Sequence, residues 1–250
     1  MELLMHIYLF VFGAILGSFY NVVGLRVPAG QSIVQPGSHC PNCQKQLRWT
    51  ELIPIVSFLL QKGKCRSCQT TISPIYPFFE GLTAVLFTIS PLLVGWSKEL
   101  PMALALISLL VIISISDIKT MLIPNKVLVF FLIVFSITRF ISPLDPWWDS
   151  LIGAAVGFGI LLVIAIISKG GMGGGDIKLF GVLGLALGLS GTLLTLFLAS
   201  FIGAAAGIVG LLTKKVKKGQ PVPFGPFIAM GALLSFFFHE HILEWYLRFF

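Results

Sequence analysis

Two pairs of cysteines are the first candidates for chemistry in this chain of 250 residues. They occur in 40-CPNC-43 and 65-CRSC-68, with 21 residues between the pairs. Two C-x-x-C pairs at such a spacing are typical of a zinc ion held by four thiolates, and a closed site of this kind is structural. Four free thiols or redox-active pairs are the alternative. We predict that zinc (Zn²⁺) folds the surrounding loop through Cys40, Cys43, Cys65 and Cys68. His39 is expected to be a bystander.

Two aspartates are the second candidates. Asp117 lies in 111-VIISISDIKTMLIPN-125, and Asp176 lies in 169-KGGMGGGDIKLFG-181. Two carboxylates close together cannot both ionise easily, so they share a proton at neutral pH. One can then act as a base on water while the other protonates or hydrogen-bonds a carbonyl, as in aspartic proteases. The alternative is that each aspartate only caps a helix, with Asp176 at an N-cap or in a first turn.

The glycines that precede Asp176 are expected to be flexible backbone, because glycine loses the most conformational freedom when it is ordered. Such a run allows a peptide or a facing helix to approach closely. We expect the run 170–175 to be mobile without substrate and to order when substrate binds, drawing Asp176 toward Asp117.

The elements that position these residues are predicted to be membrane helices. The chain is 56% hydrophobic and 11% charged, with a mean hydropathy of +0.97, whereas soluble domains are about 25% charged. Lipid excludes open sheets, and a helix needs roughly 20 apolar residues to cross. The first apolar run is expected to be a retained span and not a signal peptide. The predicted spans are about 5–25, 76–96, 100–117, 124–142, 150–168, 178–190, 192–212 and 222–240.

The uncharged run 179–212 decides the number of spans. Its 34 residues are too many for one crossing and slightly few for two. Basic residues flank it on both sides, so an even number of crossings places both ends in the cytoplasm. Two short helices broken near 188-GLSG-191 satisfy this condition. We therefore predict an all-α polytopic membrane protein with about eight transmembrane helices and a small zinc-binding cytoplasmic loop domain.

The basic residues predict the orientation. With the N-terminus outside, 14 of the 17 Lys and Arg residues fall on the inner side, as the positive-inside rule requires. The cysteine loop is then cytoplasmic, where disulfides are rare, which favours metal binding. The lysines at 214–218 are expected to contact anionic lipid. The net charge of +7 comes with no long basic tract or RNA-binding motif, so no nucleic-acid partner is expected.

This orientation sorts the acidic residues by membrane side. Glu80, Asp117 and Asp176 lie at or within the inner membrane face, where ionisable groups are costly and usually functional. Glu80 could compete for a place in the dyad, but a hydrogen bond within the bundle is the simpler role. We predict three regions: 1–25 as the first transmembrane helix, 26–75 as the cytoplasmic tetracysteine zinc-binding loop, and 76–250 as the transmembrane aspartyl protease core.

Several motifs in order along the chain resemble one known family. The sequence 17-GSFYNVVGLRVP-28 precedes the paired C-x-x-C loop and 76-YPFFEGLTA-84. These are followed by 117-DIKTMLIPN-125, then 173-GGGDIKL-179 with a G-x-G-D signature, and 223-PFGPFIAMG-231. Over nearly its whole length the chain resembles the type IV prepilin peptidases, or leader peptidase/N-methyltransferases, of the intramembrane aspartyl protease group. Tyr20 and Gly24 depart slightly from the family pattern.

The resemblance implies a bifunctional enzyme of the bacterial cytoplasmic (inner) membrane. Asp117 and Asp176 would cleave the leader from prepilin or pseudopilin precursors after a glycine, at the cytoplasmic face. The new N-terminal residue would then be methylated with S-adenosyl-L-methionine. The residues themselves support only the first activity, and no residue is predicted for the methyl donor, because 170-GGMGGGD-176 follows a membrane span and not a strand. For Arg26, a membrane-anchoring role is simplest, and the resemblance adds possible contact with substrate or methyl donor.

Two other classes of function stay open at this point. A proton-coupled transporter also places carboxylates in its spans, although it needs them near the midplane. A non-enzymatic zinc-ribbon membrane adaptor would use the aspartates only as helix caps. The oligomeric state and the identity of the pilin substrates do not follow from the sequence.

Overall fold

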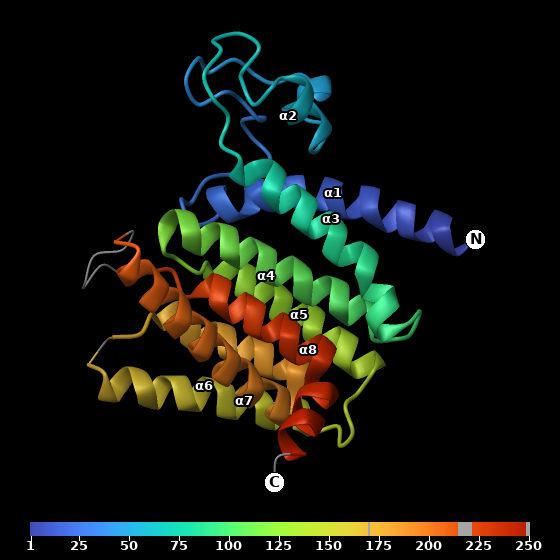
Figure 1. The fold of residues 1–250 in the computed structure, drawn as a ribbon, viewed down its shortest axis with the longest axis vertical. Helices are drawn as coiled ribbons and strands as arrows, with labels where there is room; N and C mark the ends of the chain where they lie inside the picture. The colour runs from blue at the N-terminus through green and yellow to red at the C-terminus, as the bar shows by residue number, and fades with distance from the viewer. Residues whose placement is uncertain (170, 215–221, 249–250) are drawn as a thin grey trace. The chain divides into compact units, whose positions relative to one another are not determined.

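The fold is known from a computed structural model, which describes residues 1–169, 171–214 and 222–248 (Figure 1). Gly170 and Lys215, Lys217 and Lys218 of the predicted lipid-contacting cluster lie outside the described residues. The described chain is helical, without a strand, and contains two isolated β-bridges. The all-α prediction is therefore confirmed. The chain divides into two compact units, Met1–Gly95 and Trp96–Phe250, whereas the three predicted regions stay a prediction.

The first unit is built on two long helices, α1 (Glu2–Arg26) and α3 (Ile75–Val94), which pack together. Their contact depends on glycine: a β-carbon at Gly13 would lie 2.9 Å from the α-carbon of Ala84. One at Gly17 would lie 2.8 Å from the α-carbon of Glu80. Small residues allow such close backbone approach between membrane helices. The loop between them carries a 3₁₀ turn η1 (Trp49–Glu51) and a short helix α2 (Val56–Leu60).

The second unit contains α4 (Leu100–Thr120), α5 (Asn125–Ile141), α6 (Asp149–Ile167), α7 (Gly174–Leu212) and α8 (Gly225–Leu247). Helix α4 forms its core, since most of its residues are buried, and it packs against α5 and α8. Helix α7 packs against α5, α6 and α8. A β-carbon at Gly153 of α6 would lie 2.6 Å from the carbonyl oxygen of Gly184, so glycine permits the α6–α7 contact.

Helix α7 is broken at Gly188, whose backbone (φ 71°, ψ −175°) is not helical. The predicted interruption of the run 179–212 is thus confirmed. Arg139 of α5 donates from Nε to the carbonyl of Ala186 at 3.0 Å, before the break. Both Asp149 carboxylate oxygens lie 3.2 Å from the backbone nitrogen of Leu189, after it. The backbone groups that the break leaves without helical partners are therefore satisfied by side chains.

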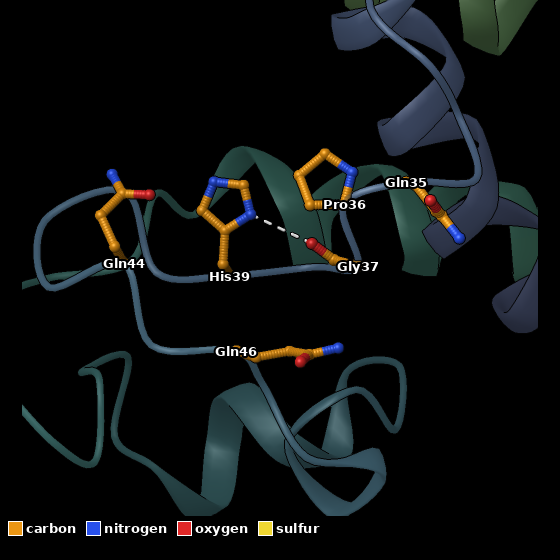
Figure 2. A pocket seen from close by; sticks show the side chains of 6 residues that line it. All are labelled: Gln35, Pro36, Gly37, His39, Gln44 and Gln46. Atoms are coloured by element: carbon orange, nitrogen blue, oxygen red, sulfur yellow. Dashed lines mark hydrogen bonds between the residues drawn. The ribbon is translucent and has the colours of Figure 1, made fainter.

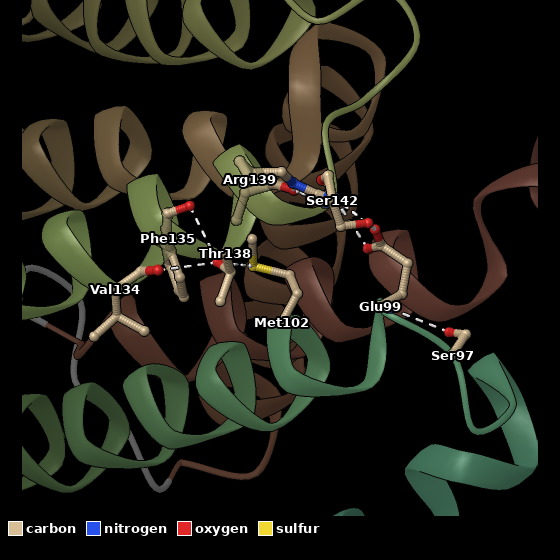
Figure 3. A network of polar contacts seen from close by, with 9 residues as sticks. Ser97, Glu99, Met102, Val134, Phe135, Thr138, Arg139 and Ser142 are labelled. Atoms are coloured by element: carbon tan, nitrogen blue, oxygen red, sulfur yellow. Dashed lines mark hydrogen bonds and ion pairs between the residues drawn. The ribbon is translucent and has the colours of Figure 1, made fainter.

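Arg139 is held in place by an ion pair with Glu99, 2.9 Å away (Figure 3). Ser142 donates a hydrogen bond of 2.6 Å to the same carboxylate. A buried arginine needs such a partner because an unpaired charge is costly away from water. Nothing in the sequence pattern indicated that Arg139 and Glu99 act at this break.

Six helices among the described residues are long and apolar enough to cross a membrane: α1, α3, α4, α6, α7 and α8. Helix α5 has 17 residues, somewhat fewer than the roughly 20 that a helix needs to cross a bilayer. Helix α7 contains one segment before Gly188 and one after it. Counting these two segments separately and adding α5 brings the number of candidate crossings from six to eight. The multi-pass membrane character is confirmed, and eight crossings stay a prediction.

Candidate functional site

The four cysteines form one cluster in the first unit. Their sulfur atoms all lie within 4.8 Å of one another. The Cys40 and Cys68 sulfurs are 3.7 Å apart, and those of Cys43 and Cys65 are 4.0 Å apart. A tetrahedral zinc ion about 2.3 Å from each sulfur requires separations of about 3.8 Å between sulfurs. The cluster therefore fits a four-thiolate metal site, as the spacing predicted.

The cluster is built from two similar turns. In the first, the Cys40 N–H donates to Lys45 and the Gln44 N–H donates to Cys40. In the second, the Cys65 N–H donates to Thr70 and the Gln69 N–H donates to Cys65. Gln44 and Gln69 occupy the left-handed region with φ of 56° and 57°. Each turn thus presents both of its thiols from a short stretch of backbone.

The thiols differ in their readiness to ionise. Hydrogen bonding to the Thr70 side chain and backbone, and then to Asn42, lowers the pKa of Cys68 to about 5. The backbone at Lys45 lowers the pKa of Cys43, but desolvation and the other three thiols outweigh it and raise the pKa to about 11. Four thiols this close therefore do not ionise together unless a cation lies between them. This arrangement favours a bound metal over four free thiols.

Asp117 lies in the last turn of α4 and is 7% exposed. Its Oδ2 accepts a hydrogen bond of 2.6 Å from the backbone N–H of Gly225, the first residue of α8. A helix N-terminus favours a negative charge because its first N–H groups have no partners within the helix. A β-carbon at Gly225 would lie 2.9 Å from that oxygen, so a glycine lets the helix come this close.

Asp176 lies in the first turn of α7, half-buried, and its N–H donates to Gly173. The mobility expected of the run 170–175 stays a prediction, but α7 begins at Gly174, so Gly174 and Gly175 are helical in this structure. The reason is packing: a β-carbon at Gly175 would lie 2.8 Å from the β-carbon of Ile123. Gly175 thus lets the start of α7 lie against the turn that follows Asp117.

A second contact joins these elements. The Lys178 ammonium donates to the Asn125 side chain at 3.0 Å, linking the first turns of α7 and α5. Ser116 donates to the carbonyl of Leu122 at 2.5 Å, which fixes the turn between α4 and α5. The ends of α4, α5, α7 and α8 therefore meet around the two aspartates.

The structure brings Asp117 and Asp176 to adjoining helix ends, since Gly175, the neighbour of Asp176, packs against Ile123 in the turn that follows Asp117. Each carboxylate also lies at a helix N-terminus, Asp117 at that of α8 and Asp176 at that of α7. Such ends stabilise negative charge, while two neighbouring carboxylates repel each other. A pair of this kind can hold a single proton between two acids, the state required to activate water.

Other candidates lie elsewhere. Glu80 belongs to the first unit and accepts a hydrogen bond of 2.7 Å from the Ile55 backbone. His39 bonds to the Gly37 carbonyl at 3.0 Å through Nδ1, and the metal-compatible cluster among the described residues consists of the cysteines alone. Arg26 donates to the carbonyls of Ser32, Pro36 and Gly37, so it fixes the start of the loop.

Three residues at the aspartate site were not assigned roles from the sequence: Ile123, Asn125 and Gly225. Gly225 contributes through its backbone N–H, which no side-chain pattern can indicate. Its signal was the motif 223-PFGPFIAMG-231, in which a glycine between prolines suggests a close backbone approach.

Comparisons with known proteins follow the same division of the chain. Residues 11–94 match the bacterial peptidase A24 N-terminal domain, and residues 104–208 match the type IV leader peptidase family. The chain is 49% identical to the prepilin leader peptidase/N-methyltransferase of Bacillus subtilis (strain 168), with 96% of this chain and 97% of the relative covered.

Proteins with the same printed name in Aeromonas salmonicida (strain A449) and Neisseria gonorrhoeae are each 32% identical. Those matches cover 95% of this chain, and 92% and 93% of the two relatives. No solved structure shows significant similarity. On these matches, the chain belongs to the type IV leader peptidase family.

Proposed function

We propose that this protein cleaves the leader peptide from prepilin-like precursors and then methylates the new N-terminal residue. The observation that carries the proposal is the meeting of Asp117 and Asp176 at adjoining helix ends in one unit. The relatives' names supply the substrate class and the second activity. The enzyme is an aspartic endopeptidase and an S-adenosylmethionine-dependent N-methyltransferase.

In the cleavage step, the two aspartates share one proton. The ionised carboxylate takes a proton from a water molecule, which attacks the scissile carbonyl, while the protonated carboxyl donates to the carbonyl oxygen. As the C–N bond breaks, the departing amine takes a proton from the acid that received one, and a hydroxyl of the tetrahedral intermediate returns a proton to the other aspartate, so the pair again holds one proton. The Gly225 N–H holds the Asp117 carboxylate in position throughout.

The site lies at the cytoplasmic face of the membrane in this proposal, with the N-terminus of the chain outside. Asp117 lies near the C-terminal end of α4 and Asp176 near the N-terminal end of α7. With α5 and α6 as one crossing each, these two ends lie on the same side of the bilayer. The distribution of Lys and Arg supports the assignment of that side to the cytoplasm. A basic leader that precedes a membrane helix would present its cleavage site at this face.

Two bound groups belong to the proposal. Cys40, Cys43, Cys65 and Cys68 hold a structural zinc ion, consistent with their sulfur separations. When bound, S-adenosylmethionine supplies the methyl group: a C–N bond forms at the new amine as the C–S bond breaks, sulfur keeps the electron pair, and the amine loses a proton. The chain's own task is to bind the donor and to present the amine.

A cleavage assay in lipid nanodiscs with a prepilin substrate tests the proposal. Asp117→Asn and Asp176→Asn should each reduce kcat/KM by about 10³-fold or more, since a neutral amide cannot replace a carboxylate in a proton-sharing pair. Glu240→Gln, a change at an exposed acid of α8, is the matched control and should retain wild-type cleavage. Full activity in either aspartate variant would remove the dyad from the mechanism.

The other classes of function have less support. A proton-coupled transporter needs its carboxylates near the midplane, whereas these lie at helix ends. A zinc-ribbon adaptor would not explain why two aspartates lie together beside the N-terminus of a third helix. The relatives found give neither class any support.

A further inference from the structure

The first unit contains a cavity of about 360 Å³. It lies among the inner end of α1, the first turns of α3 and the cysteine loop, and all its lining residues belong to this unit. Small-molecule sites typically have volumes of about 300–1,000 Å³, with mostly apolar walls and a few placed polar groups. Asn21, Arg26, Phe58, Tyr76 and Glu80 are among the lining residues.

Asn21 supplies an unsatisfied acceptor. The side chain is 3% exposed, and its Nδ2 donates to the carbonyls of Gly17 and Tyr76, each at 3.2 Å. Because both partners are acceptors, the amide must turn its NH₂ toward them, which leaves Oδ1 as the remaining atom. That oxygen is buried without a hydrogen-bond partner. A buried acceptor of this kind is costly unless a ligand or water completes it.

Glu80 supplies a carboxylate without a cation. It is 8% exposed, accepts from the Ile55 N–H at 2.7 Å, and also bonds to Ser18. Among the described residues it has no ion pair with Lys, Arg or His. Burial of a carboxylate is unfavourable unless a positive group offsets it. The cavity therefore has the chemistry to take a cation.

Arg26 supplies the opposite charge at the same cavity. Three hydrogen bonds run from its terminal nitrogens to the carbonyls of Ser32, Pro36 and Gly37. A guanidinium has five N–H groups, so two stay available for an anion. Phe58 and Tyr76 contribute aromatic surface. A fitting ligand combines a positive centre, a carboxylate and a flat ring.

We infer that this cavity binds S-adenosylmethionine, with Glu80 and Asn21 facing its positive and hydrogen-donating groups and Arg26 facing its carboxylate. The assignment rests on the proposed function, which requires a methyl donor, and it names the site where that donor binds. The cysteine loop forms one wall of the cavity, through Cys40 and Cys65 among others. A metal ion held by the four cysteines would therefore shape this wall of the binding site.

A second hollow of the same loop has no comparable chemistry (Figure 2). Gln35, Pro36, Gly37, His39, Gln44 and Gln46 line it. Its side chains include no carboxylate, lysine or arginine, and His39 is directed to the Gly37 carbonyl. The cavity next to Glu80 is therefore the better candidate for a charged ligand.

Equilibrium binding of radiolabelled S-adenosylmethionine to the full-length protein in nanodiscs tests the assignment. Glu80→Gln removes the charge at nearly constant shape and should weaken binding at least ten-fold. Glu2→Gln alters an exposed acid of α1 in the same unit and should leave the affinity unchanged. Wild-type affinity in Glu80→Gln would overturn the site. If the wild-type protein binds no donor while prepilin cleavage is intact, the methyltransferase half of the proposed function fails instead.

Photolabelling decides the matter even if Glu80→Gln does not fold. Ultraviolet irradiation of the wild-type protein with labelled S-adenosylmethionine, followed by proteolysis and mass spectrometry, should place the label within residues 1–95. Excess S-adenosylhomocysteine should compete for the same peptides. Label confined to residues 96–250 would assign the donor to the other unit and overturn the inference.

Discussion

The cysteine cluster and the aspartate pair are two sites built in opposite ways. Each half of the cluster is one tight turn, in which backbone hydrogen bonds around Cys40 or Cys65 present two thiols from neighbouring positions. The aspartate pair brings together Asp117 of α4 and Asp176 of α7, which are 59 positions apart in the sequence. The backbone N–H of Gly225, from a third helix, completes the site. One site is made by local turns, and the other by the packing of a whole unit.

This difference decides how each site tolerates change. The turns need only their own backbone and a metal ion to bring four thiols within 4.8 Å. The pair depends on close approaches at Gly175 and Gly225, where any β-carbon would collide with its neighbours. A substitution far from the carboxylates should therefore disturb the aspartate pair more than a comparable substitution beside the cysteines disturbs the metal site.

The largest expected effect is loss of metal from the cluster. Cys40→Ser or Cys65→Ser should reduce the zinc content from one ion per chain to nearly none, because a closed site requires all four thiolates. Metal analysis measures this, and exposure of the loop lysines to trypsin reports its unfolding. Ser67→Ala, within the same turn but not a ligand, should retain the zinc. Absence of metal from the wild-type protein, with four thiols open to alkylation, would contradict the prediction.

A second test moves the aspartate pair without touching a carboxylate. In Gly225→Ala the new methyl group would lie 2.9–3.2 Å from three atoms of Asp117, so the carboxylate must shift. A displacement of about 1 Å at a catalytic group can cost roughly 10²-fold in rate, and we expect a loss of that order in kcat/KM for prepilin cleavage. Gly207→Ala on α7 is the control, since a methyl group there meets open space. Equal rates in the two variants would show that α8 does not position Asp117.

The same contrast explains which features could be predicted from the sequence. Spacing alone predicted the cysteine cluster, because its geometry is set within short segments. Hydropathy predicted the helices and the break near Gly188, since length and bilayer thickness constrain them. The partners of Asp117 and the caps at the break were missed. Gly225, Arg139 and Asp149 act across sequence separations of 40 residues or more, which only the packed structure reveals.

A third test concerns the break in α7. Gly188 has a backbone conformation that is essentially restricted to glycine, and a β-carbon there would overlap the Asp149 carboxylate. Such conformations cost non-glycine residues about 1–3 kcal/mol. Gly188→Ala should therefore lower the free energy of unfolding by at least that amount, measured by thermal or denaturant unfolding in detergent. Gly159→Ala, where a methyl group meets no neighbour, should be neutral or slightly stabilising. Equal stability of both variants would mean that α7 can straighten.

The smallest expected effect distinguishes two reasons for the glycines before Asp176. Gly174 and Gly175 are consecutive residues in the first turn of α7, and both would gain helix propensity as alanine. Only Gly175 is in close contact, 2.8 Å from the β-carbon of Ile123, whereas a methyl group at Gly174 meets no neighbour. If the glycines serve packing, Gly175→Ala should reduce kcat/KM by about ten-fold, while Gly174→Ala changes it less than about two-fold.

If the glycines serve backbone flexibility instead, both variants should lose activity to a similar extent, since each removes one flexible position. The comparison needs only the prepilin cleavage assay and a check that both proteins unfold at the wild-type temperature. Ile123→Ala in the Gly175→Ala background adds a rescue test, because the smaller side chain should make room for the new methyl group. Recovery of activity in that double variant would show that the start of α7 is positioned by its contact with the turn after Asp117. Failure to recover, with equal losses in both single variants, would assign the glycines to movement during substrate binding.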